Sequence, residues 1–104
     1  MRVLSYNAQQ ARALTPLLEA IGREIVERQD TIRALLLRAS NELYDPEKLA
    51  HDLLRHRKAL AAAHLELYNL GCALVGRRPL TFSIRRAGQG PRSFLWQGGE
   101  LREY

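Results

Sequence analysis

Two long amphipathic segments joined by a short break constrain this chain more than any other feature. Apolar residues recur in steps of three, four and seven from Leu14 to Ala39, and similar spacing runs from Leu49 to Leu70. Steps of three and four are typical of a helix face that packs along a neighbouring helix. Because the connection between the segments is so short, the pattern predicts an antiparallel helical hairpin.

Capping residues indicate where the first helix begins. Asn7 with Gln10 three residues later forms a capping-box pattern, and the first helix is predicted over about 7–43. Pro16 lies inside this span and removes one intrahelical hydrogen bond. Either the helix kinks there or it restarts with Thr15 as its cap, and we expect a kink near Pro16.

The second helix is predicted over about 46–70. Asp45 is a good N-cap, and Pro46 suits the first helical position because its fixed φ is already helical. Gly71 directly follows the pattern and can end the helix in the left-handed conformation.

Both helices carry apolar residues that a single seam cannot bury. On the first helix these include Leu36 and Leu37, and on the second Leu54 and Leu65. A C-terminal sheet and a second copy of the protein are the two candidates to cover them. We therefore expect a homodimer with these four leucines near its contact.

The period changes from helical to alternating after the second helix. The stretch LTFSIR alternates apolar and polar residues and predicts a strand over about 80–86. Strands are also predicted over about 93–97 and about 100–104. Gly98 and Gly99 between them suit a tight hairpin turn because both accept positive φ.

This pattern predicts an α+β fold in one domain, residues 1–104. Residues 1–70 form the helical hairpin, to which the opening RVLS could add a short strand, and residues 71–104 form a small antiparallel β-meander. The Gly-Gly turn sets the register of the last hairpin, with Trp96 opposite Leu101.

Three segments resemble a known family. YNAQQARALTPLL, LGCAL and FLWQGGE occur here in the order found in an uncharacterised bacterial family, catalogued as domain of unknown function 2203. The resemblance implies two long helices followed by strands, and it implies no particular chemistry. Members have Asp where Thr81 precedes Phe82, Cys where Leu95 precedes Trp96, and commonly a final histidine. If those polar residues build a site in relatives, this chain lacks it.

The net charge of +5 is concentrated in the tail. From Arg77 onward six arginines accompany two glutamates, whereas the rest of the chain has ten basic and nine acidic residues. With Phe82, Phe94 and Trp96, these arginines could form a stacking and phosphate-binding platform for single-stranded nucleic acid. The alternative, which packing favours, is that the aromatic rings face the helices and the sheet is a lid. The candidate polyanion contacts are Arg77, Arg78, Arg85, Arg86 and Arg92.

The pattern predicts no metal, cofactor or catalytic site. His51, His56 and His64 are spaced five and eight residues apart, so no two share a helix face closely. Cys72 is the only cysteine; it follows a helix C-terminus, where the dipole raises a thiol pKa, and we expect it in the core. No nucleophile, base and orienting group converge. The remaining enzymatic alternative is a degenerate site that uses Asp52, His56 or His64 in a cleft between helices and sheet.

Composition bounds the location and the class of function. No apolar run approaches the ~18 residues of a membrane span, and the start lacks the apolar region of a signal peptide. A single cysteine fits a reducing compartment, so we expect a cytoplasmic protein with no membrane contact. The leading hypothesis is a non-enzymatic interaction or assembly protein that acts as a homodimer with an unknown protein partner. Nucleic-acid or ribosome-associated binding through the arginine-rich tail is the runner-up.

Overall fold

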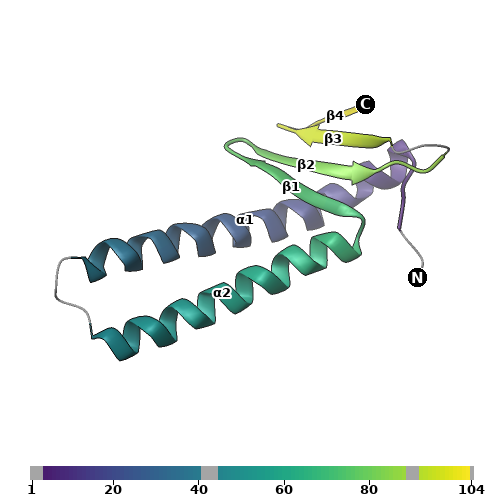
Figure 1. Cartoon of the computed structure of the whole chain (residues 1–104). Helices are drawn as coiled ribbons and strands as arrows, with labels where there is room; N and C mark the ends of the chain where they lie inside the picture. The colour runs from purple at the N-terminus through teal and green to yellow at the C-terminus, as the bar shows by residue number, and fades with distance from the viewer. Residues whose placement is uncertain (1–3, 41–44, 89–91, 104) are drawn as a thin grey trace.

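The computed structural model describes residues 4–40, 45–88 and 92–103. It confirms an α+β fold in which an antiparallel helical hairpin precedes a four-stranded antiparallel sheet (Figure 1). The elements are α1 (Ala8–Ala39), α2 (Pro46–Asn69), β1 (Cys72–Arg77), β2 (Leu80–Arg85), β3 (Ser93–Gln97) and β4 (Glu100–Glu103).

The molecule is elongated because the sheet covers only one end of the hairpin. Figure 1 shows the four strands over the end where α1 begins and α2 finishes, while the other end projects past them. The radius of gyration is 16.8 Å, with extents of 54 × 31 × 20 Å. A compact chain of this length would have a radius of gyration of about 13 Å. We call the projecting part, residues 31–39 and 46–54, the arm.

The first helix begins as its capping box predicts. Asn7 Oδ1 accepts a hydrogen bond from the Gln10 amide at 2.8 Å, and Gln10 Oε1 accepts one from the Asn7 amide at 2.9 Å. The helix runs without interruption through Pro16, so the alternative of a restart at Thr15 is wrong, and the kink stays a prediction. The Thr15 hydroxyl donates to the carbonyl of Arg12 at 2.7 Å. That bond satisfies the carbonyl left without an amide donor by the proline.

Both ends of α2 agree with the predicted caps, whereas the C-terminal end of α1 differs from its predicted bound. Asp45 accepts from the Glu47 amide at 3.0 Å, and Gly71 adopts a φ of 75° directly after the C-cap of α2. In contrast, α1 ends at Ala39 instead of about 43, with Ser40 as its C-cap. The predicted residues 41–43 lie outside the described residues.

The sheet is a meander in the order β1-β2-β3-β4, and its first strand is an addition to the prediction. In β1 the side chains alternate between covered and exposed, yet the exposed Ala73 and Val75 are themselves apolar. The alternation is therefore invisible in the sequence. The later strands confirm the predicted hairpin, with Trp96 opposite Leu101 and with Gly98 at a φ of 57°. Tyr104, at the end of the predicted last strand, lies outside the described residues.

Among the described residues at the start of the chain, Tyr6 contacts the sheet through an isolated bridge. Tyr6 forms an isolated parallel bridge with Arg86, and the Tyr6 amide donates to the Arg85 carbonyl at 3.0 Å. Its hydroxyl donates to the Leu70 carbonyl at 2.7 Å, which satisfies an acceptor at the end of α2. Leu4 and Ser5 are not in a strand, and the rest of the predicted segment lies outside the described residues.

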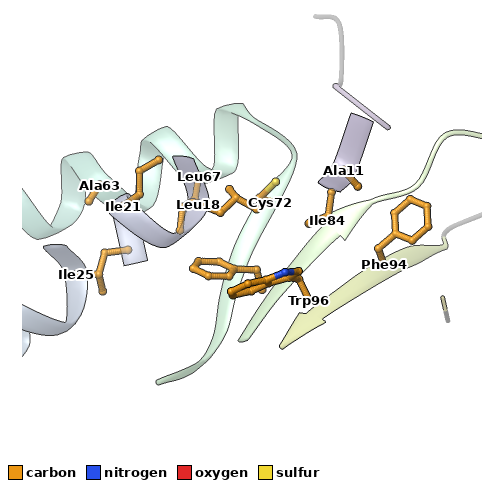
Figure 2. Close-up of a cluster of buried hydrophobic side chains, with 11 residues drawn as sticks. Ala11, Leu18, Ile21, Ile25, Ala63, Leu67, Cys72, Ile84, Phe94 and Trp96 are labelled. Atoms are coloured by element: carbon orange, nitrogen blue, oxygen red, sulfur yellow. The ribbon is translucent and has the colours of Figure 1, made fainter. Parts of the chain in front are cut away.

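The core lies between the sheet and the covered end of the hairpin. Figure 2 shows Leu18 and Ile21 of α1 and Leu67 of α2 on one side, facing Trp96 and Ile84 from the strands. The cluster consists of Ala11, Leu18, Ile21, Ile25, Ala63, Leu67, Cys72, Phe82, Ile84, Phe94 and Trp96. The arm lies outside this cluster, so its stability depends on the contact between two helices alone.

Candidate interaction surfaces

The first two tail arginines bind a carboxylate of α1. Arg77 Nη2 donates to Asp30 Oδ1 at 2.7 Å, and Arg78 Nη2 lies 3.7 Å from Asp30 Oδ2. These ion pairs attach the β1–β2 turn to the helix, directly before the sheet-covered part gives way to the arm. Arg77 is thus committed to a structural contact, and Arg78 stays exposed beside it.

Asp30→Asn is expected to lower the free energy of unfolding by about 1 kcal/mol, because a charge-assisted hydrogen bond is lost from a half-buried position. Urea denaturation of the variant and the wild type measures the difference. Glu27→Gln, on the exposed face of the same helix, is the matched control. An Asp30→Asn protein as stable as the control would contradict the role assigned to this ion pair.

The other three candidate polyanion contacts, Arg85, Arg86 and Arg92, lie at the opposite corner of the sheet. Arg86 pairs with Glu103 at 3.6 Å and lies 5.8 Å from the ring centre of Phe94. The Arg86 amide donates to the Arg92 carbonyl at 3.0 Å, which brings Arg92 beside β2. Arg85 and Arg92 are both exposed. The five predicted polyanion contacts therefore divide between two places.

The aromatic side chains of the sheet face the helices. Phe82 and Phe94 are 0% and 1% exposed, and Trp96 is 8% exposed. The Phe82 and Trp96 rings pack on each other with centroids 5.8 Å apart. Base stacking needs a ring with an open face, so these rings cannot serve as a stacking platform. The sheet covers the helices as a lid.

Thr81 and Leu95 are the two positions at which this chain departs from the family that it resembles. Each alternates with core residues of its strand. Thr81 donates to the Pro79 carbonyl at 3.0 Å and accepts from Gln97 Nε2 at 3.0 Å. Leu95 is paired with Ser83 in the register of β2 and β3 and is half-buried. These hydrogen bonds and this packing account for both residues within the sheet itself.

The histidines do not converge. His56 lies at the inner seam of α2, where its Nδ1 accepts a hydrogen bond from Arg28 Nη1 at 3.0 Å. This contact crosses the hairpin and joins the side chains of α1 and α2. His51 and His64 are exposed. Within the described part of the chain, no three His, Cys, Asp or Glu side chains could hold a metal ion.

Cys72 is a core residue, as expected. It is 6% exposed, and its Sγ lies 3.6 Å from the Leu70 carbonyl. Burial raises the pKa of the Cys72 thiol to about 11. The upward direction of this pKa shift matches the expectation, but its cause is loss of solvation rather than the helix dipole. A thiol with this pKa is protonated at neutral pH and is a poor nucleophile.

Stability is expected to fall more steeply above pH 9 in the wild type than in Cys72→Ala. The unfolded chain releases the thiol proton near the ordinary pKa of 9.0, whereas the folded chain holds it until about 11. The contribution is fully present below pH 9 and is lost as the pH rises toward 11. Urea denaturation at pH 7, 9 and 10.5 measures it. Parallel pH profiles for the two proteins would contradict the burial of the thiol. Burial raises the pKa of Tyr6 in both proteins, and the smaller rise due to the charge of Cys72 is lost in Cys72→Ala, which adds to the expected difference in the same direction.

The four predicted dimer leucines are exposed, but they lie on two different surfaces. Leu36 and Leu37 are 47% and 63% exposed on α1, and Leu54 and Leu65 are 53% and 57% exposed on α2. Leu36 follows the buried Leu18 by five helical turns, so it continues the sheet-facing side of α1 beyond the end of the sheet. The α2 pair points away from the face that packs on α1.

The α2 surface extends further than the two predicted leucines. Tyr68 is 74% exposed one turn after Leu65, and the sequence-based prediction did not assign it to this surface. We call this stripe the outer seam of α2. It consists of His51, Leu54, Lys58, Ala61, Leu65 and Tyr68, all of which are exposed.

Comparisons with protein families, curated proteins and solved structures found no match to this chain. The resemblance to the bacterial family therefore stays a prediction. No helix within residues 4–40, 45–88 and 92–103 combines the length and the apolar character needed to cross a membrane.

Proposed function

We propose that the protein is a non-enzymatic interaction or assembly protein of the cytoplasm that acts as a homodimer. The observation that carries the proposal is the set of large apolar side chains exposed along both helices. The sheet covers one end of the hairpin and leaves these side chains in solvent. Contiguous apolar stripes on a small protein are typical of a contact surface.

The placement of the reactive groups supports a role without catalysis. His56 is engaged by Arg28 at 3.0 Å, and the Cys72 thiol is buried and protonated. His51 and His64 are exposed and separated by thirteen residues on one helix, about 20 Å along its axis. A site for nucleophilic catalysis needs a nucleophile, a base and an orienting group within hydrogen-bond reach of one another.

Light scattering of the purified full chain tests the proposal, run alone and with short RNA and DNA at low and high salt. A mass of twice 11.9 kDa that does not respond to nucleic acid is the expected result. Apolar contacts do not weaken with salt, so the mass should persist at high salt. A mass of 11.9 kDa under every condition would overturn the proposal.

Nucleic-acid binding at the corner formed by Arg85 and Arg92 is the second candidate. Both guanidinium groups are exposed, and Arg86 lies beside them. Because the rings are buried, such binding would use phosphate contacts, whose affinity falls steeply with salt. Loss of salt-sensitive RNA binding in an Arg85→Gln, Arg92→Gln variant would establish this role. Arg33→Gln on the exposed face of α1 is the control.

A further inference from the structure

We propose that the outer seam of α2 binds the same seam of a second copy, antiparallel about a two-fold axis. Leu54 of one protomer then packs against the partner's Leu65, and the reverse contact repeats across the axis. This inference rests on the proposed homodimer and adds its surface, its orientation and its register.

The spacing of the outer seam is that of a helix-packing surface. Its six residues follow one another in steps of three, four, three, four and three, and every one of them is exposed. The buried residues of α2, including Leu53, Ala63 and Leu67, form a separate seam on another side of the helix. A helix with two seams packs on two neighbours, whereas α1 and the sheet occupy only one side of α2 (Figure 1).

The outer seam is self-complementary when it is reversed. Its centre lies between Ala59 and Leu60, and residues equally far from that centre form matching layers. A two-fold axis there places Leu54 against the partner's Leu65, because a two-fold contact pairs each position with its reciprocal. The two remaining layers bring Lys58 onto the partner's Ala61 and His51 onto the partner's Tyr68.

The central layer favours the antiparallel arrangement over a parallel one. A parallel pair would place Lys58 against the partner's Lys58, with two ammonium groups in one layer. The antiparallel pair sets the lysine stem against alanine, whose small side chain leaves room for the stem to lie along the helix while the ammonium reaches solvent. Both leucine layers then contain only apolar side chains.

Charges beside the outer seam are complementary in the same register. Arg55 and Glu66 both lie about a quarter turn from the seam in the same direction. The two-fold axis brings Arg55 to the level of the partner's Glu66, within about 3 Å along the helix axis. Arg55 is 64% exposed and Glu66 is exposed. The contact of Arg55 with Asp52 is long, at 3.9 Å, so the guanidinium can turn toward the second protomer.

A cysteine pair in the full chain tests the register directly. Under mild oxidation, the Leu54→Cys, Leu65→Cys variant is expected to give a covalent dimer on a non-reducing gel. Each single variant is expected to stay monomeric on the gel, because identical positions lie about 16 Å apart across the axis. An internal disulfide is excluded by the same separation along one helix. Wild type, with its buried Cys72, is the control.

Replacing the two leucines by oppositely charged residues tests the same register without cross-linking. Leu54→Glu and Leu65→Lys are each expected to weaken dimerisation at least tenfold. The double variant is expected to recover to within threefold of wild type, because the introduced carboxylate faces the introduced ammonium of the second protomer. Circular dichroism checks the fold. Substitutions at these exposed positions should leave the fold undisturbed.

The outcomes separate this inference from the proposed function. A wild-type dimer without the 54–65 cross-link, or one in which Leu54→Cys alone cross-links equally well, overturns the antiparallel register and leaves the homodimer intact. A wild-type monomer overturns both. Cross-linking confined to the double cysteine variant, together with recovered dimerisation in the Leu54→Glu, Leu65→Lys variant, supports the register.

Discussion

Phe82→Ala is expected to lower the free energy of unfolding by about 3–5 kcal/mol, the range for removing a buried ring. Phe82 is fully buried and packs on Trp96, with the two ring planes tilted by 41°. It also lies against Gly22 of α1, so it joins the sheet to the helices. Domains of this size have a total stability of about 5–15 kcal/mol, and the variant is therefore close to unfolding.

Urea denaturation followed by circular dichroism measures the effect of Phe82→Ala. Leu37→Ala is the matched control, since Leu37 is 63% exposed and should change stability by less than about 0.5 kcal/mol. A loss of under about 1 kcal/mol for Phe82→Ala, well below the range for a buried ring, would contradict a closed core between sheet and hairpin.

Gly22→Leu is expected to destabilise the protein by more than about 3 kcal/mol through overpacking. A Cβ at Gly22 would lie 2.5 Å from Phe82 Cζ and 3.4 Å from Leu80 Cδ2. The ring cannot move aside, because Phe82 is 0% exposed. Leucine is a better helix former than glycine by about 1 kcal/mol, so helix propensity alone predicts that the variant would be more stable than the wild type. Steric conflict with the sheet decides the outcome.

Thermal unfolding of Gly22→Leu and Ala20→Leu distinguishes packing from propensity. Ala20 lies on the exposed face of the same helix, so its replacement should leave the melting temperature nearly unchanged. A Gly22→Leu protein that melts at or above the wild-type temperature would show that the sheet does not pack on this face of α1.

The helical hairpin could be predicted because its signals are local. Capping at Asn7 and Asp45 involves neighbours within three residues, and the seam repeats every three or four residues. The last hairpin was equally accessible, since two adjacent glycines with positive φ determine its register. Each of these features is encoded within a few consecutive residues.

Features that depend on distant contacts could not be predicted in the same way. β1 is apolar on both faces, so its periodicity is hidden, and the pairing of Asp30 with Arg77 joins residues 47 positions apart. The length of α1 that the sheet covers is also a tertiary property. It leaves Leu36 exposed although Leu18, on the same side of the helix, is buried.

The candidate contact surfaces were foreseen in part. Sequence spacing identified Leu54 and Leu65 as surplus to the hairpin, and the structure places both on the outer seam of α2. The same reasoning grouped them with Leu36 and Leu37, because composition cannot show that the sheet ends before the arm. Tyr68 was recoverable from its position three residues after Leu65.

Sedimentation equilibrium of the full chain over a concentration series tests the central claim, that a second copy covers the apolar surface left by the sheet. We predict a mass that rises to twice 11.9 kDa with increasing concentration and that is unaffected by high salt. A mass fixed at 11.9 kDa up to about 100 µM would contradict the claim. It would mean that the dimer dissociation constant lies above about 100 µM, a free energy of association weaker than about −5.5 kcal/mol.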